Sequence, residues 1–223
     1  MIVLPLHFRN GHLFLEVGGS LWLFDTGAPT SFGKSNTLTL INKTFKMGSS
    51  YLDLTAEKLS SFVGVDCVGL LGADVLGQFD FLLDVPDGRV EISMAELEHA
   101  GAPIRLNDFM GIPIVSGRIR GVDYQMFFDT GAQISYFQNE EILSSFPSAG
   151  SLTDFYPGVE PFKINTHNID VMLGTLNVTL RCGVLPGLLG ATLMMAGAEG
   201  IIGNESIITR TVGYFPRRHL LVL

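Results

Sequence analysis

Leu21-Trp-Leu-Phe-Asp-Thr-Gly-Ala28 is the stretch of sequence on which the fold depends, because it occurs a second time as Gln125-Met-Phe-Phe-Asp-Thr-Gly-Ala132. In both copies an apolar run leads into Asp-Thr-Gly, and the two aspartates, Asp25 and Asp129, lie 104 residues apart. Such a run is typical of a buried strand, and Asp and Gly favour a turn after it. The repetition predicts two similar units, each with a carboxylate where a strand ends.

A second pair of matching segments follows the first. Gly69-Leu-Leu-Gly-Ala-Asp-Val-Leu76 corresponds to Gly200-Ile-Ile-Gly-Asn-Glu-Ser-Ile207, and in both cases an apolar strand ends 20 residues after the second glycine. Gly187-Leu-Leu-Gly-Ala191 matches the first copy letter for letter, but no closing strand lies at that distance from it. We therefore assign Gly203 as the equivalent of Gly72.

The repeats divide the chain into two lobes, residues 1–100 and 101–223, with a mostly β pattern and a few short helices. Gly18-Gly19 separates two apolar runs, which is a hairpin signal, and Pro157-Gly158 is typical of a type II turn. Residues 139–145 predict a short helix, because the segment opens with Asn, a good N-cap, and continues with two glutamates.

Composition excludes several classes of protein. The net charge of −8 argues against a general nucleic-acid binder, and 47% hydrophobic residues exclude a disordered chain. Cys67 and Cys182 are read as two buried thiols, with a single disulfide bond as the alternative, and Trp22 is read as a core residue. No pair of residues has the spacing of metal ligands, so no metal or cofactor is expected. The histidines are interpreted as surface or local contacts: His7, His12, His99, His167 and His219.

The N-terminal segment does not have the pattern of a signal peptide. Residues 1–9 lack a basic region, and Pro5 and His7 interrupt their apolar residues. The longest apolar tract, 184–202, contains a proline, four glycines and a glutamate, which a membrane-spanning helix of about 20 apolar residues would not tolerate. We expect a cytoplasmic protein without stable membrane insertion.

Two similar lobes can pack about a pseudo-twofold axis, and this packing would bring their Asp-Thr-Gly turns face to face. Asp25 and Asp129 would then lie side by side. Two carboxylates in contact share one proton near neutral pH, because ionising both would place like charges together. Such a pair contains a base that can take a proton from water and an acid that can polarise a carbonyl.

These motifs resemble those of the aspartic protease superfamily. Phe24-Asp-Thr-Gly-Ala-Pro-Thr-Ser31 and Phe128-Asp-Thr-Gly-Ala-Gln-Ile-Ser135 are similar to its catalytic loops, and 70–76 and 201–207 to its hydrophobic-hydrophobic-Gly element. Alanine after each glycine is typical of the retropepsin-like branch, whereas two lobes in a single chain are pepsin-like. The resemblance implies acid-protease-like closed β-barrels, two in number and related by pseudo-twofold symmetry.

The resemblance also implies roles for the residues of both loops. By this resemblance the aspartates activate water, the threonines brace the loops against each other, and the glycines offer carbonyl groups to a bound peptide. The site residues that it implies are Asp25, Thr26, Gly27, Ala28, Asp129, Thr130, Gly131 and Ala132.

The family closes a β-hairpin flap over its substrate, and the sequence offers one candidate in each lobe. The first is the segment 37–54, with its tip near Gly48-Ser-Ser-Tyr51, and the second is the hairpin around Tyr156. The resemblance further implies a sheet of about six strands that joins the lobes, formed in part by the two chain ends and the segment 89–92.

The sequence thus predicts an aspartic endopeptidase that acts on a peptide or protein substrate. One alternative is a catalytically silent peptide-binding module that uses the same cleft. Another is an obligate dimer in which each chain supplies one aspartate. Because one chain carries both Asp-Thr-Gly copies, we expect a monomer.

Overall fold

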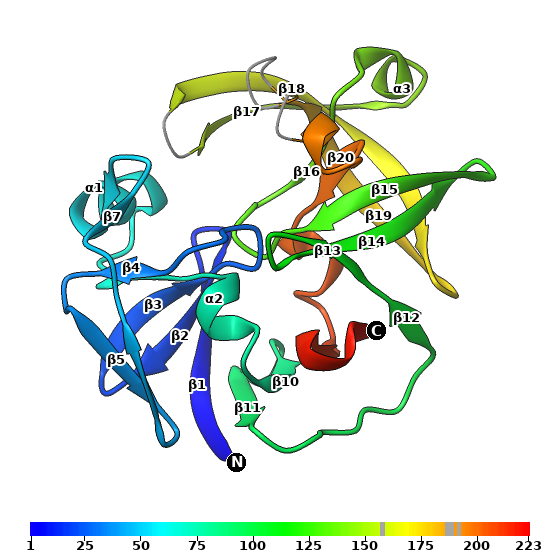
Figure 1. Ribbon diagram of the computed structural model, residues 1–223. Helices are drawn as coiled ribbons and strands as arrows, with labels where there is room; N and C mark the ends of the chain where they lie inside the picture. Colours follow the sequence, from blue (N-terminus) through cyan, green and yellow to red (C-terminus); the bar gives the residue numbers. More distant parts are fainter. Residues whose placement is uncertain (157–158, 186–189, 191–192) are drawn as a thin grey trace.

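The computed structural model describes residues 1–156, 159–185, 190 and 193–223, and over these residues the chain is mostly β, as the sequence predicts (Figure 1). Their strands form a ten-stranded sheet, an eight-stranded sheet and two small hairpins. In order across the ten-stranded sheet, the strands are β12 (Pro103–Arg105), β22 (Leu220–Val222), β21 (Thr211–Phe215), β10 (Asp80–Asp84), β11 (Arg89–Ser93), β1 (Ile2–Arg9), β2 (His12–Val17), β3 (Ser20–Phe24), β9 (Gly69–Leu71) and β4 (Phe32–Gly33).

The eight-stranded sheet comes entirely from the second half of the chain. In order, its strands are β13 (Asn107–Phe109), β14 (Ile112–Ile119), β15 (Val122–Phe128), β20 (Gly200–Ile202), β16 (Ser135–Phe137), β19 (Leu176–Val184), β18 (Val159–Leu173) and β17 (Ser148–Tyr156). β14 also pairs with β18, with Gly117 opposite Leu173, so the order of strands returns on itself.

The two copies of the sequence repeat have the same strand pairing. β3 runs parallel to β9, with Phe24 opposite Leu71, and β15 runs parallel to β20, with Phe128 opposite Ile202. A short helix follows β9 and another follows β20, namely α2 (Ala73–Leu76) and the 3-10 helix η1 (Asn204–Ser206). The assignment of Gly203 as the equivalent of Gly72 is therefore confirmed. The competing copy at 187–191 lies almost wholly outside the described residues.

Two local predictions are confirmed. Gly18 and Gly19 have φ angles of 59° and 78° and form the turn between β2 and β3, a conformation that glycine adopts without strain. Helix α3 (Glu140–Ser144) begins after Asn139, whose side chain accepts a hydrogen bond from the Glu141 amide. The turn predicted at Pro157-Gly158 lies outside the described residues.

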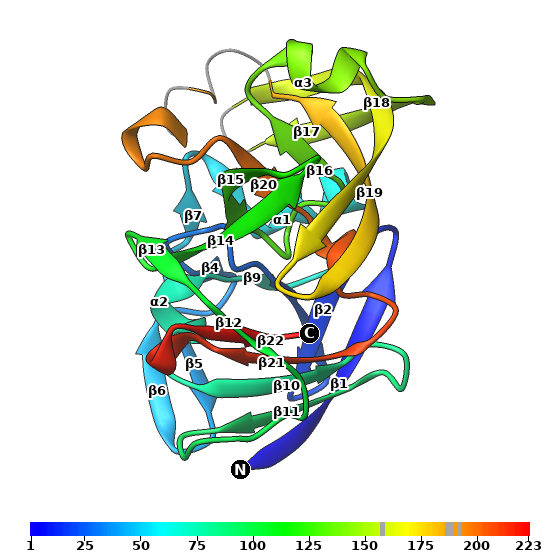
Figure 2. The same cartoon turned by 90° about the vertical axis from the view of Figure 1, so that its right-hand side faces the viewer.

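Six neighbouring strands of the larger sheet join the two halves of the chain (Figure 2). β10, from the first half, pairs with β21, from the second, and Phe81 lies opposite Tyr214. β11 and β1 continue the sheet on one side, and β22 and β12 continue it on the other. The predicted joining sheet of about six strands is therefore confirmed, with the chain ends in β1 and β22.

Aromatic side chains connect the two repeats beneath the Asp-Thr-Gly turns. Phe24 packs edge-on against Phe81 at 5.2 Å between ring centroids, and Tyr214 lies 6.0 Å from both Phe81 and Phe128. All four belong to the main core, as does Trp22, which confirms its predicted place. Cys67 and Cys182 are both buried and free, also as predicted.

The segment 37–54 differs from its prediction. Instead of one hairpin with its tip near Gly48 to Tyr51, it forms two, because the residues with positive φ that can turn the chain are Ile41, Leu52 and Asp53. The first pairs β5 (Thr37–Leu40) with β6 (Lys43–Lys46), and the second pairs β7 (Ser50–Tyr51) with β8 (Leu54–Thr55).

Further helical residues lie in α1 (Ala56–Val63), in η2 (Pro216–Arg218) and at 193–195. Helix α1 follows β8, is capped by Thr55 and ends at Gly64 in the left-handed conformation. The 3-10 helix η2 lies between β21 and β22. No helix within the described ranges has the length and apolar character needed to cross a membrane.

Candidate active site

The two Asp-Thr-Gly turns face each other where β3 and β15 end. A Cβ atom added to Gly27 would lie 2.1 Å from Asp129 Cγ, and one added to Gly131 would lie 2.4 Å from Asp25 Cγ. Each glycine therefore lies against the carboxyl group of the opposite turn, and any side chain there would displace it. This reciprocal contact brings Asp25 and Asp129 side by side.

The threonines hold the two turns together. Thr26 Oγ1 donates to the Phe128 carbonyl at 2.6 Å, and Thr130 Oγ1 donates to the Phe24 carbonyl at 2.7 Å. Each hydroxyl also accepts from the backbone amide of the other threonine, at 3.1 and 3.0 Å. Both residues are fully buried. The four bonds in this dry environment fix the separation of the turns.

Backbone amides orient both carboxyl groups. Asp25 Oδ1 accepts from the amides of Gly27 and Ala28, at 2.9 and 3.0 Å. Asp129 Oδ1 accepts from those of Gly131 and Ala132, at 2.9 and 3.2 Å. The alanine side chains carry no donor, so at these two positions only the backbone bonds to the aspartate.

The two carboxyl groups share a hydrogen bond and titrate together. Burial, and then the charge of Asp129, raise the pKa of Asp25 well above the usual aspartate range. Burial also raises the pKa of Asp129, and the hydrogen bond to Asp25 opposes this change. Ionising both groups would place two buried like charges in contact. The pair therefore holds one proton to a higher pH than a single exposed aspartate.

The second repeated motif, which contains Gly72 in one copy and Gly203 in the other, packs against the two turns. The Gly72 amide donates to Ser31 Oγ at 2.8 Å, and the Gly203 amide donates to Ser135 Oγ at 3.1 Å. A Cβ at Gly72 would lie 2.6 Å from the Ala28 carbonyl oxygen. This close approach of backbone to backbone requires glycine, and it places the motif against the turn that carries Asp25.

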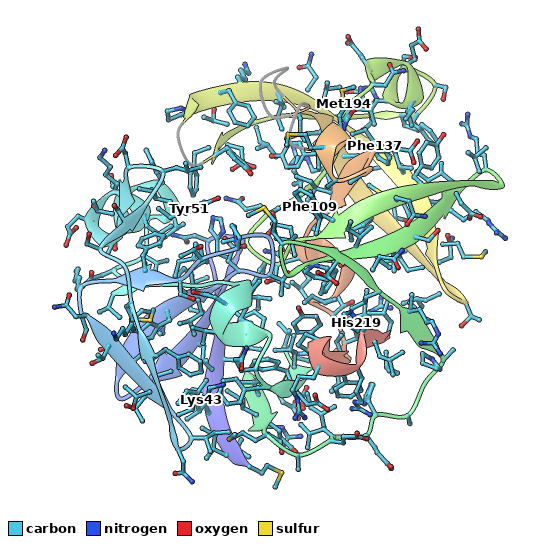
Figure 3. The ribbon with its side chains drawn as sticks, viewed as in Figure 1. Lys43, Tyr51, Phe109, Phe137, Met194 and His219 are labelled. Carbon is cyan, nitrogen blue, oxygen red and sulfur yellow. The ribbon has the colours of Figure 1, made fainter. Side chains whose placement is uncertain are left out.

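A cavity opens above the two aspartates, and both halves of the chain line it. Tyr51 and Phe109, labelled in Figure 3, belong to its wall. Tyr156, at the end of β17, lines it as well, and Leu54, Leu59 and Ile112 make it largely apolar. Gly48 is not among the lining residues; it pairs with Phe32 instead.

His12 also lines this cavity, which corrects its interpretation as a surface or local contact. It is 2% exposed, and its Nδ1 lies 3.1 Å from the carbonyl oxygen of Gly131, 119 residues away. A carbonyl only accepts, so Nδ1 carries the proton and Nε2 accepts from Gln133 at 2.9 Å. Burial lowers the pKa of His12, which favours this neutral form.

Tyr136 and Asp154 form a second polar pair in the cavity wall. The Tyr136 hydroxyl donates to Asp154 Oδ2, and the Phe155 amide donates to Asp154 Oδ1 at 2.8 Å. Tyr136 follows Asp129 by seven residues, and the residue seven after Asp25 is Phe32. The two halves of the cavity are therefore chemically different, with His12, Tyr136 and Asp154 all near the turn that carries Asp129.

The hairpin of β17 and β18 contacts the first half of the chain beside the cavity. Phe155, from β17, stacks on Phe62, from α1, with 4.8 Å between ring centroids. His12 also lies near Phe155, with 6.3 Å between the ring centroids. This aromatic contact joins the hairpin, which lies near the top of Figure 1, to the helix at the left of that view.

In the part of the chain that the structure describes, no three His, Cys, Asp or Glu side chains are grouped to hold a metal ion. The sequence matches none of the family models and none of the curated proteins with which it was compared. The geometry of the paired aspartates and of the cavity above them is therefore the basis for assigning a function.

Proposed function

We propose that the protein is an aspartic endopeptidase that hydrolyses peptide bonds with a water held between Asp25 and Asp129. The observation that carries this proposal is the pairing of two partly exposed carboxyl groups across two turns that buried threonines brace. The resemblance of both motifs to those of aspartic proteases supports it. So does the largely apolar cavity above the pair, which both halves of the chain line.

The reaction follows from the shared proton. The ionised carboxylate removes a proton from water as the water oxygen attacks the peptide carbonyl carbon, and the protonated carboxyl group donates its proton to the carbonyl oxygen. The resulting tetrahedral diol collapses when the ionised carboxylate takes a proton from one hydroxyl group and the protonated carboxyl group gives its proton to the leaving nitrogen. The carbon–nitrogen bond then breaks, and the pair again holds one proton. No acyl-enzyme is formed.

The proposed substrate is a peptide that lies extended in the cavity and bonds through its backbone. The carbonyls of Gly27 and Gly131 are the proposed acceptors, and the one on Gly131 already accepts from His12. The β17–β18 hairpin is the proposed flap, because Tyr156 at its end lines the cavity and Phe155 reaches α1. Tyr51 is proposed to contact the substrate from the first half.

We further propose that residues 1–100 and 101–223 form two lobes, each a closed β-barrel, related by a pseudo-twofold axis. The parallel pairs β3–β9 and β15–β20 support the symmetry, and the pairing of β14 with β18 supports closure of the second barrel. Since one chain supplies both aspartates, the active form is proposed to be a monomer.

Asp25→Asn and Asp129→Asn test the proposal. Each is expected to reduce cleavage of a mixed peptide library below a few per cent of wild type, because an amide cannot act as the base or share the proton. Retained cleavage in either variant would exclude the paired mechanism. If the wild-type protein binds peptides and cleaves none, the silent binding module is the correct function.

Thermal melting of the same variants provides the control for folding. The raised pKa values mean that the fold favours the protonated pair. The wild-type protein therefore keeps this stabilisation below about pH 4, the usual aspartate value, and loses it as the pH rises through the raised pKa. Asp25→Asn is expected to melt at or above the wild-type temperature, and its advantage is expected to grow with pH.

A further inference from the structure

Asp154 places a buried carboxyl group in the cavity wall. It is 8% exposed, lies on β17 within the proposed flap, and lines the same cavity as Asp25 and Asp129. The Tyr136 hydroxyl and the Phe155 amide each bond one of its oxygens. A carboxylate can accept about four hydrogen bonds, so it retains capacity for further donors.

The described residues supply no positive charge to this carboxylate. No lysine or arginine among them lies within 4.0 Å of it, and none lines the cavity. His12, on the neighbouring wall, accepts a hydrogen bond from Gln133 at Nε2. Burial lowers the pKa of His12, although the bond to Gly131 and the charge of Asp154 oppose this change, so its neutral form is favoured. A carboxylate removed from water is costly unless a cation accompanies it.

We infer that Asp154 selects substrates with a lysine or arginine at one fixed position near the cleaved bond. This inference rests on the proposed endopeptidase function. The ammonium or guanidinium group of the substrate would supply the missing charge and bond the free lone pairs of Asp154, while its aliphatic stem packs on apolar neighbours such as Ile112 and Phe162.

The asymmetry of the cavity restricts the preference to one side of the cleaved bond. Tyr136, the partner of Asp154, corresponds in the repeat to Phe32, which has no hydroxyl group to offer a carboxylate. The wall nearest the Asp25 turn contains Leu23, Pro29 and Leu70 instead. One end of the substrate therefore meets a carboxylate and the other meets an apolar surface.

A first experiment maps cleavage sites on a proteome-derived peptide library. From the best site, two peptides are then made that differ only in lysine against norleucine at the enriched position. Wild type is expected to give a kcat/KM about tenfold or more higher for the lysine peptide, the range of a hydrogen bond to a charged group. In Asp154→Asn the ratio is expected to fall towards one.

Asp170→Asn is the matched control, because it removes one carboxylate from the same hairpin at an exposed position outside this cavity. It is expected to keep the wild-type ratio. Cleavage by wild type without enrichment of basic residues would overturn the inference and leave the proposed function standing. The wild-type ratio decides this even if Asp154→Asn does not fold.

Absence of any cleavage by wild type would instead overturn the proposed function. The inference is then tested on a peptide selected from the same library by its binding to Asp25→Asn. A lysine version and a norleucine version of it, which differ only at the position enriched among the bound peptides, are compared by fluorescence anisotropy. Tighter binding of the lysine peptide, lost in the double variant Asp25→Asn/Asp154→Asn, would support it. Equal affinity for both peptides would overturn it.

Discussion

Alanine after each Asp-Thr-Gly leaves the titration of the paired aspartates to burial and backbone bonds. The amides of Ala28 and Ala132 donate to Asp25 and Asp129, but their methyl groups add no donor. A hydroxyl group in their place could donate to the outer carboxylate oxygen, which would favour the ionised form and lower its pKa. The two alanines thus keep the shared proton in place to higher pH.

The double variant Ala28→Ser/Ala132→Ser tests this effect. The basic limb of the kcat/KM profile reports loss of the shared proton. Burial and the repulsion between the two carboxylates raise the pKa of this proton. Added hydroxyl donors lower that pKa, so the limb is expected at lower pH in the double variant than in wild type. A limb that stays in place or moves upward would show that the alanines do not control the titration.

The repeat reveals which residues hold the backbone, but it does not reveal which residues give the cavity its chemistry. Asp25, Thr26 and Gly27 recur because both turns need the same bonds, so the sequence alone identifies them. Tyr136 corresponds in the repeat to Phe32, which has no hydroxyl group, and the partners of His12 lie 119 and 121 residues away. His12 meets Gly131 only when β2 packs against the opposite turn, which no local pattern indicates.

At the scale of elements, the sequence predicts strands better than it predicts hairpin tips. The segment 37–54 contains the expected strand residues, yet its turns fall at Ile41 and Leu52, which are not typical turn residues. Tertiary packing sets these turns: Leu38, Leu40 and Met47 are buried in the main core. The helix after Asn139 was predictable because its cap is local.

The contact between α1 and β17 is expected to limit opening of the proposed flap. Phe62 stacks on Phe155, which lines the cavity, and an aromatic pair contributes roughly 0.5–1.5 kcal/mol beyond its buried area. Phe62→Ala is therefore expected to raise amide hydrogen exchange in β17 and β18 by roughly two- to tenfold. Phe8→Ala is the control, because Phe8 is 43% exposed and Phe62 is 40% exposed. It is expected to leave this exchange unchanged. Unchanged exchange in Phe62→Ala would show that the stack does not hold the hairpin.

At the scale of the whole molecule, the joining sheet makes the two halves of the chain depend on each other. The two halves meet where β10 pairs with β21. Asp80, a fully buried residue on β10, forms ion pairs there with Arg217 and Arg218 of η2. Phe81 and Tyr214, opposite each other on β10 and β21, also connect the phenylalanines that precede the two aspartates. The geometry of the site and the stability of this sheet are therefore coupled.

Leu221→Ala tests that coupling at the C-terminal strand. β22 lies between β12 and β21, and Leu221 is fully buried in the main core. Truncating a buried leucine costs about 2–5 kcal/mol, and each kcal/mol lowers Tm by about 2–4 °C in a chain of this size, so Tm is expected to fall by roughly 4–20 °C. Met195→Ala is the control, because Met195 is 78% exposed.

Because the sheet spans both halves, unfolding is expected in one transition, with tryptophan fluorescence from Trp22 and circular dichroism giving the same midpoint. If Trp22, in the first half, reports the wild-type midpoint in Leu221→Ala while circular dichroism shows an earlier loss, the halves unfold independently and the sheet does not couple them.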